Sequence, residues 1–425
     1  MSRFLVLLAA LLMISGCATK TVEPYARPAP EYAIPARPDG PFGDLESELR
    51  AEYGSEASGF RLLDRNEDGL RWRLALIDSA SHSIDVQYYL WYGDTAGRIL
   101  AKRLLDAADR GVRVRMLLDD LNTLISDAAT VVLRDGVVAR IDAHPNVELR
   151  LFNPWSSREL AGRVGEANRD FQRINQRMHN KAMIVDNRAA ILGGRNIGDE
   201  YMGLNALFNF HDLDVLGIGP VARQASEVFD AYWNSDWVMP VSALKIPVSS
   251  EELAAGRAEL ERQISDAASL ERFPIAPQSW SAEFAELRGS WHVGTSRVYS
   301  DRPTAGAIEP VMLDRIREMF GAAKRELLVV NAYIIPTDRG ISTLRGLKGR
   351  GVDIKILTNS LASHDVPAVN SHYKAWRRPI LEAGAQLYEM RHDAAIQALV
   401  SDTPPTRAKF LGLHAKAMVV DREQV

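Results

Sequence analysis

The sequence predicts a duplicated α/β fold: two α/β sandwiches of mixed or parallel sheets flanked by helices, with an active site between the two halves. Two observations lead to this fold. The pattern His-x-Lys-x-x-x-x-Asp occurs twice, at residues 179–186 and 414–421. Each copy also follows a matching succession of strand, helix and strand. Strands that alternate with helices are typical of parallel β-α-β units in layered α/β proteins.

The two halves carry the same elements in the same order. In the first half, the apolar and β-branched run 83–90 (SIDVQYYL) predicts a strand, and 98–109 has helical spacing that ends before Gly111. Residues 112–118 (VRVRMLL) predict the next strand. The corresponding elements of the second half are a strand at 326–333, a helix at 341–349 and a strand at 352–357. The strings RGVRVRMLLDD and RGVDIKILTNS match closely, which indicates an internal duplication.

The N-terminus has the features of an export signal. An apolar run at 4–14 is too short to span a bilayer and follows a basic residue, so residues 1–17 are predicted to form a signal peptide. The run ends at Ile14-Ser15-Gly16-Cys17, and Cys17 is the only cysteine, which excludes a disulfide within one copy of the chain. Residues 18–58 are predicted to be a Pro-rich tether. Within it, residues 21–41 are expected to be extended and disordered, because they contain Pro24, Pro28, Pro30, Pro35, Pro38 and Pro41.

The body then divides into a first domain at 59–240, a helical insertion at 241–300 and a second domain at 301–425. The insertion contains SSEELAAGRAELERQISDAA, whose Ser-Ser start and acidic first turn predict a helix on the surface. Its role is either packing or a lid over the substrate cleft. The preceding helix at 222–237 has aromatic residues at helical spacing, and these are expected to be core residues: Phe229, Tyr232, Trp233 and Trp237.

The repeated motif has the residues needed to cut a phosphodiester without a metal. Alternate residues of a strand face the same side, so His179 projects with Lys181 and His414 with Lys416. One histidine can attack phosphorus, the other can protonate the leaving alcohol, and the lysines can hold the phosphate oxygens. Asp186 and Asp421 have odd spacing from the histidines, so we expect them to support the strand ends and not to carry protons.

Charge limits the possible partners. The net charge is −4 with no polybasic tail, which argues against nucleic acid as a substrate. The arginines before His179 allow two interpretations, a solvated helix face or a surface for anionic headgroups: they are Arg158, Arg163, Arg169, Arg173 and Arg177. The other histidines have no metal-ligand spacing, so we expect neither a metal site nor a cofactor.

The paired motif resembles that of the phospholipase D superfamily. Three longer strings resemble bacterial cardiolipin synthases of the C type: HNKAMIVDNRAAILGGRNIGDEY, DVQYYLWYGDTAGRIL and LTNSLASHDVPAVNSHYKAWRRPILEAGAQLYE. The resemblance implies a phosphatidyltransferase that works on phospholipids, phosphatidylglycerol and possibly phosphatidylethanolamine, through a phosphohistidine. A hydrolytic phospholipase D, a nuclease or a catalytically silent, lipid-anchored binding protein are the alternatives.

The resemblance also implies roles for further residues. Gly193, Gly194 and Asn196 match the family's Gly-Gly/Ser-x-Asn element, where the glycines let backbone approach the phosphate and the asparagine contacts its oxygens. Asp212 matches the acidic residue that supports the nucleophilic histidine. On this basis we expect His179 to be the nucleophile, supported by Asp212, and His414 to be the general acid.

Two expectations concern the ends of the chain. The sequence around Cys17 resembles a bacterial lipoprotein signal, which implies lipidation of Cys17 and a membrane anchor facing the periplasm, on either the inner or the outer membrane. A second Gly-Gly/Ser-x-Asn element is expected to begin near residue 428, beyond Val425, so the second domain as given is predicted to be incomplete.

Overall fold

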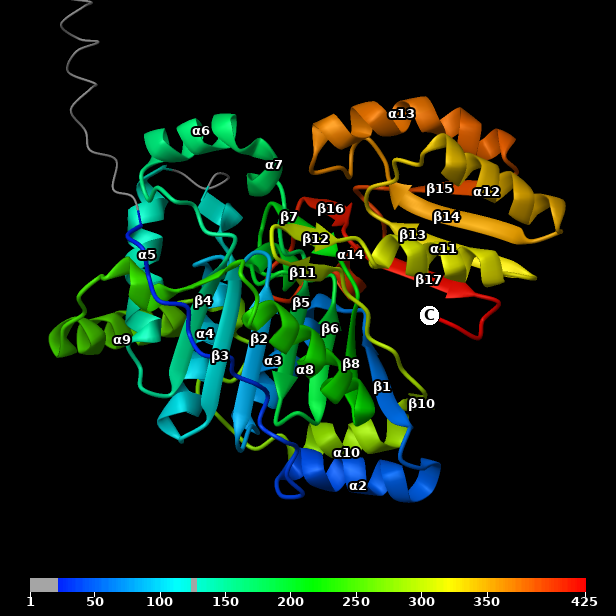
Figure 1. Ribbon diagram of the computed structural model, residues 1–425. Helices are drawn as coiled ribbons and strands as arrows, with labels where there is room; N and C mark the ends of the chain where they lie inside the picture. The colour runs from blue at the N-terminus through cyan, green and yellow to red at the C-terminus, as the bar shows by residue number, and fades with distance from the viewer. Residues whose placement is uncertain (1–21, 124–127) are drawn as a thin grey trace, which may run out of the picture.

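The computed structural model describes residues 22–123 and 128–425. Two sheets with flanking helices lie side by side (Figure 1). The larger sheet has nine strands in the order β10-β1-β8-β6-β5-β2-β3-β4-β9, and the smaller has four in the order β15-β14-β13-β17. The predicted duplicated α/β architecture is therefore confirmed.

The strands are short. Those of the nine-stranded sheet are β1 (Ser58–Leu63), β2 (Ser83–Tyr88), β3 (Arg113–Asp119), β4 (Val147–Phe152), β5 (Lys181–Val185), β6 (Ala189–Gly193), β8 (Asp214–Ile218), β9 (Val238–Pro240) and β10 (His292–Gly294). Those of the four-stranded sheet are β13 (Glu326–Asn331), β14 (Asp353–Asn359), β15 (Gln386–Met390) and β17 (Lys416–Val420). Two small pairs consist of β7 (Phe208–His211) with β16 (Phe410–Leu413), and β11 (Arg302–Thr304) with β12 (Ala307–Glu309).

Strand pairing repeats between the halves. In the first sheet, β2 and β3 are parallel, β3 and β4 are parallel, and β2 and β5 are antiparallel. In the second sheet, β13 and β14 are parallel, β14 and β15 are parallel, and β13 and β17 are antiparallel. The order β4-β3-β2-β5 thus recurs as β15-β14-β13-β17. Each His-Lys-Asp motif occupies the same place in its half, at the antiparallel strand beside the first parallel one.

Helices cover both sheets. Those of the first half are α2 (Pro41–Tyr53), α3 (Asn66–Asp78), α4 (Thr95–Asp109), α5 (Ala128–Asp142), α6 (Leu160–Arg169), α7 (Phe171–Ile174) and α8 (Pro220–Trp233). Those that follow are α9 (Ser250–Ser265), α10 (Ser281–Ser290), α11 (Met312–Ala322), α12 (Asp338–Gly349), α13 (Pro367–Glu382) and α14 (Gln397–Val400). The predicted helices α4 and α12 begin earlier than expected, because the side chains of Asp94 and Thr337 cap their first turns.

Two apolar cores lie on the two faces of the nine-stranded sheet, and a third fills the second half. The aromatic residues of α8 and the turn after it are buried, as predicted. Phe229 and Trp233 stack with ring centroids 5.5 Å apart. Their spacing therefore reflects core packing and not a lipid-binding belt.

The insertion packs on the first half. Helix α9 begins with the predicted capping box between Ser249 and Glu252. Ile264, Trp280 and Phe284 are buried in the core of the first half. Figure 1 places α9 beside α5 and α4, and α10 beside α2 at the end remote from the second sheet. Residues 241–300 therefore pack on the first half and contribute to its core.

The Pro-rich segment corrects an expectation. Residues 22–40, which we call the strap, lack regular secondary structure but follow the surface of the first half. The amide of Val22 donates to the Ser156 carbonyl (2.7 Å), and that of Ala33 to Asp230 Oδ2 (2.9 Å). Residues 41–53 form α2. The expected disorder of residues 21–41 was thus wrong for the described residues 22–41, because the extended strap leaves its amides and carbonyls free to bond with the body. The tether expected through residue 58 contains a helix instead. Cys17 and the signal peptide lie outside the described residues.

Candidate active site

The two halves meet through the small parallel pair β7–β16. Leu413 lies opposite His211, and the amide of His414 donates to the His211 carbonyl (2.8 Å). The buried amide of Asn359 holds the end of β16, since its Nδ2 donates to the Leu413 carbonyl (2.7 Å) and its Oδ1 accepts from the Leu413 amide (2.9 Å). The residues that follow the two strands, Asp212 and His414, are therefore brought together.

Asp212 supports His414 and not His179. Nδ1 of His414 lies 2.5 Å from Oδ2 of Asp212, and both side chains are buried. Burial tends to raise the pKa of Asp212, but the hydrogen bond from His414 and the positive charges nearby outweigh it and lower that pKa. The expected pairing of Asp212 with His179 was wrong. The parallel β7–β16 pair carries the carboxylate of one half to the histidine of the other.

His179 has a different environment. His179 is exposed, and its ring lies 4.6 Å from the ring of Tyr89, measured between centroids. Nζ of Lys181 lies 3.2 Å from Nδ1 of His179 and donates to the His179 carbonyl (2.8 Å). In the second copy, Nζ of Lys416 donates to the His414 carbonyl in the same way. Each lysine therefore folds back onto its own histidine.

The site gathers two lysines beside the two histidines. Burial, and then the charge of Lys416, lower the pKa of Lys181 to about 7. Enclosure among protein atoms lowers the pKa of Lys416 to about 8, although part of its side chain stays open to solvent. The pKa of His179 is lowered by desolvation and by both lysines, whereas Asp212 partly opposes the lowering at His414. Two lysines placed beside two histidines are suited to bind a phosphate.

The aspartates of the two motifs hold strand ends. Asp186 and Asp421 both adopt positive φ angles, 52° and 55°. The carboxylate of Asp186 accepts from the amides of residues 81–83, just before β2, at 2.7–2.9 Å. The carboxylate of Asp421 accepts from the amides of residues 324–326, just before β13. Neither carboxylate lies at the histidines, in agreement with a supporting role.

Gly193 and Gly194 make room for carboxylates. A Cβ on Gly193 would lie 2.1 Å from Oδ1 of Asp214, and one on Gly194 would lie 2.1 Å from Oδ1 of Asp212. These contacts require glycine at both positions, and their role in admitting a phosphate stays a prediction. Asn196 is buried, and its Oδ1 accepts from the Leu90 amide (3.3 Å). The Asn196 amide group is therefore held in the loop beside the cleft.

Two tyrosines were not predicted. Nζ of Lys181 lies 5.4 Å from the ring centroid of Tyr89, and Nζ of Lys416 lies 5.4 Å from that of Tyr333. The hydroxyl of Tyr333 donates to Asp365 at 2.8–2.9 Å. Burial and neighbouring carboxylates, including Asp365, raise the pKa of Glu200 to about 7. The strings QYYL and NAYI could have indicated these two residues, because in each half a tyrosine lies at or just after the end of the first parallel strand.

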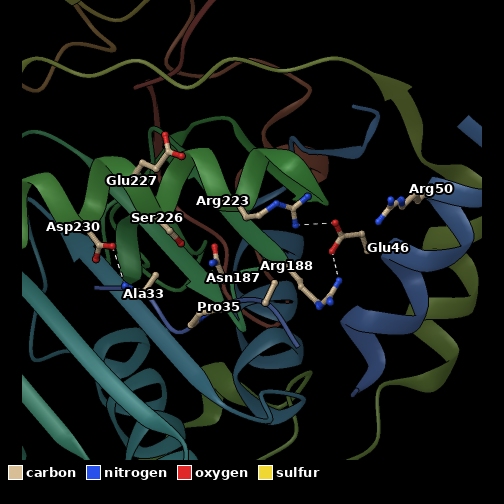
Figure 2. A pocket seen from close by; sticks show the side chains of 11 residues that line it. Ala33, Pro35, Glu46, Arg50, Asn187, Arg188, Arg223, Ser226, Glu227 and Asp230 are labelled. Carbon is tan, nitrogen blue, oxygen red and sulfur yellow. Dashed lines mark hydrogen bonds and ion pairs between the residues drawn. The ribbon is translucent and has the colours of Figure 1, made fainter. Parts of the chain in front are cut away.

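A separate cavity of about 680 Å³ lies between the strap, α2 and α8 (Figure 2). Glu46 bonds Arg223 at 2.7 Å and also pairs with Arg188. Asn187 and Arg188 form the turn after β5, at the opposite end of that strand from Lys181. This cavity is thus remote from the histidines, and its charged residues anchor the strap and α2.

Within the described ranges 22–123 and 128–425, no group of three or more His, Cys, Asp or Glu side chains is placed to hold a metal ion. The same residues include no helix long and apolar enough to cross a membrane.

The family now follows from comparison with known proteins. Residues 74–233 and 316–425 match the family described as "Cardiolipin synthase, PLD-like domain". The two matched segments contain both His-Lys-Asp motifs, and together they make up more than half of the chain. The chain belongs to this phospholipase D-like cardiolipin synthase family.

Among its relatives is cardiolipin synthase C of Escherichia coli (strain K12), 36% identical over 370 residues, which are 85% of this chain and 76% of that protein. Cardiolipin synthase A of Pseudomonas entomophila (strain L48) is 26% identical over 93% of this chain and 72% of its own length. The fold resembles the crystal structure of phosphatidylserine synthase from Haemophilus influenzae Rd KW20, with a TM-score of 0.54 and 14% identity, over 88% of this chain and 80% of that one.

Proposed function

We propose that the protein is a phosphatidyltransferase that makes cardiolipin from phospholipid phosphodiesters. The observation that carries the proposal is the meeting of two His-Lys pairs in one cleft, with the Asp212 carboxylate bonded to one of the two imidazoles. The membership of the cardiolipin synthase family supports the same substrate class.

In the first step, Nε2 of His179 attacks the phosphorus of a phosphatidyl donor. The bond from phosphorus to the headgroup alcohol breaks, and His414 gives its proton to the leaving oxygen. In the second step, the hydroxyl of an acceptor lipid attacks phosphorus, its proton passes to His414, and the P–N bond breaks. Lys181, Lys416 and the Asn196 amide would hold the phosphoryl oxygens as charge develops.

The assignment of roles rests on the proton affinities of the two imidazoles. A nucleophile must be neutral and a general acid must carry a proton. His179 has no carboxylate partner among the described residues, and two lysines disfavour its cation. His414 keeps the proton more readily because Asp212 accepts its Nδ1–H. Asp212 therefore acts on the acid in this proposal, where the sequence had suggested that it supports the nucleophile.

The decisive experiment is product analysis. The enzyme is given phosphatidylglycerol that is labelled in its acyl chains, in vesicles with and without phosphatidylethanolamine. Cardiolipin is the expected product in at least one of the two mixtures. Phosphatidic acid alone would identify a hydrolase, since water would then resolve the same intermediate. No product from either mixture would contradict the proposal and favour a silent binding protein.

The proposal includes an anchor. Lipidation of Cys17 would hold the enzyme on a bacterial envelope membrane, facing the periplasm, because an apolar run ends at Gly16-Cys17 and the chain has no other cysteine. More than one acyl chain on a single residue would give stable attachment. Labelled fatty acid should be incorporated into the protein in cells and should be absent from Cys17→Ala. Equal labelling of the two would sink this part of the proposal.

A further inference from the structure

We propose that the face formed by α6, α7 and the first residues of the strap lies on the lipid bilayer, so that the strap sets the orientation of the enzyme on the membrane. We call this surface the α6–α7 face and define it by Tyr25, Val164, Arg169 and Phe171. The inference rests on the proposed acylation of Cys17, and it adds which end of the molecule meets the lipid.

The length of chain before the strap limits where the membrane can be. Val22 is the first described residue, and its amide is bonded to the Ser156 carbonyl (2.7 Å). Cys17 precedes Val22 by five residues. A fully extended chain spans at most about 3.6 Å per residue, so an anchored Cys17 lies within about 18 Å of Val22. The membrane surface must therefore be close to the part of the body that contains Ser156.

Residues beside this point have the character of a lipid-binding surface. A cavity of about 520 Å³ is lined by Val22, Pro24 and Tyr25 of the strap together with residues 154–156 and 169–170. Phe171 is 68% exposed, Val164 is 50% exposed and Tyr25 is 40% exposed. Apolar and aromatic side chains at such a surface gain free energy when they enter the interfacial region of a bilayer.

Four of the five arginines before His179 are bonded within the first half. Arg173 pairs with Glu166 and Asp170, and Arg177 pairs with Asp119. Arg158 and Arg163 are turned into the first half, where Arg158 pairs with Asp120 and Asp135. Arg169, in contrast, is exposed and makes no ion pair with another residue in the described part of the chain. A cation on this face is attracted to anionic phospholipid, by about 1 kcal/mol for each residue near the surface.

The α6–α7 face lies at the active-site end of the sheet. Helix α7 ends at Ile174, and β5 begins at Lys181, with His179 between them. Figure 1 places α6 and α7 at the end of the first half where β7 and β16 lie, while α2 and α10 lie at the opposite end. Contact through α6 and α7 therefore brings the bilayer to the side of the molecule from which a phospholipid can reach the cleft.

Depth-dependent quenching tests the orientation. Since acylation consumes the thiol of Cys17, a single introduced cysteine carries the label in the full, acylated protein. The probe is an environment-sensitive fluorophore on Phe171→Cys, bound to vesicles of phosphatidylglycerol and phosphatidylethanolamine that contain a nitroxide-labelled lipid. The matched control is Tyr53→Cys, because Tyr53 is 48% exposed on α2 at the opposite end. We expect at least threefold stronger quenching at 171 than at 53. Equal quenching, or stronger quenching at 53, would overturn the proposal while the anchor stands.

Activity gives a second measurement. Phe171→Asp is expected to lower turnover about tenfold on vesicles, the cost of removing one aromatic side chain from the interface, and to leave turnover on dispersed short-chain phospholipid unchanged. Tyr53→Asp should change neither. Equal rates on vesicles for Phe171→Asp and the unaltered protein would overturn the proposal. Absence of turnover on both substrates would refute the proposed function, and the quenching result would still decide the orientation.

Discussion

The first and second His-Lys-Asp motifs have the same local geometry in very different surroundings. Strand β5 is buried along its length and pairs with β2 and β6, whereas β17 is partly exposed and, of the described strands, pairs with β13. The carboxylates of Asp186 and Asp421 nevertheless accept hydrogen bonds from equivalent backbone segments, at the starts of β2 and β13. The local geometry of each motif therefore depends on the adjacent strand, β2 or β13, and not on how deeply the sheet is buried.

The two motifs differ where the halves touch. His414 is buried and bonded to the carboxylate of Asp212, while His179 is exposed and faces Lys181. This asymmetry comes from the pairing of β7 with β16, which lies outside both motifs. Two closely similar motifs therefore receive different protonation behaviour from a contact between halves, and this difference is the basis for the assigned roles.

The largest expected effect separates the two histidines. His179→Ala should abolish turnover and form no phosphoenzyme, because it removes the nucleophile. His414→Ala should reduce turnover by about 10²–10⁴-fold, the usual contribution of a general acid, and still accumulate phosphoenzyme from a substrate with a good leaving group. Acid quench with phosphorus-labelled phospholipid measures both. Label retained in His179→Ala and lost in His414→Ala would reverse the two roles.

The next effect concerns Asp212. Asp212→Asn keeps the shape of the side chain but removes the charge that favours the protonated form of His414, so turnover should fall by about 10²-fold. Because the carboxylate raises the pKa of His414, its loss lowers that pKa. The alkaline side of the kcat profile, where the acid loses its proton, should then move to lower pH. Movement of the acidic side to lower pH, with the alkaline side unchanged, would instead assign Asp212 to the nucleophile.

Local patterns predicted most of the fold. The duplication, both motifs, the strand-end role of Asp186 and the aromatic core of α8 all follow from periodicity and spacing within a few residues. The partner of Asp212 could not be predicted in this way, because the register of β7 against β16 joins segments about 200 residues apart. The strap was missed for a related reason. Prolines predict an extended chain, but they do not reveal that the body offers Ser156 and Asp230 as partners for its amides.

The free energies of unfolding of two variants test whether the two motif aspartates contribute equally to stability. Asp186→Asn should lower the free energy of unfolding by about 2–3 kcal/mol, because a buried carboxylate that accepts from three amides is replaced by a group with a donor. Asp421→Asn should have a smaller effect, since Asp421 is only half-buried and water can replace part of its hydrogen bonding. Denaturant unfolding of both variants measures the difference. Equal losses would mean that the surroundings of the two strands do not matter.

The smallest effect is a change in titration without a change in structure. Burial and the charge of Lys416 lower the pKa of Lys181 to about 7, and enclosure lowers that of Lys416 to about 8. In the ligand-free protein, rising pH should therefore discharge Lys181 first and Lys416 second. NMR of protein labelled at the lysine ε-carbons should contain two signals with these midpoints, each removed by the corresponding arginine variant. Inorganic phosphate should move both midpoints upward, because a bound anion favours the charged lysine. If neither signal titrates below about pH 9, the cleft is more hydrated than its packing indicates, and the preference of His179 for the neutral state loses part of its support.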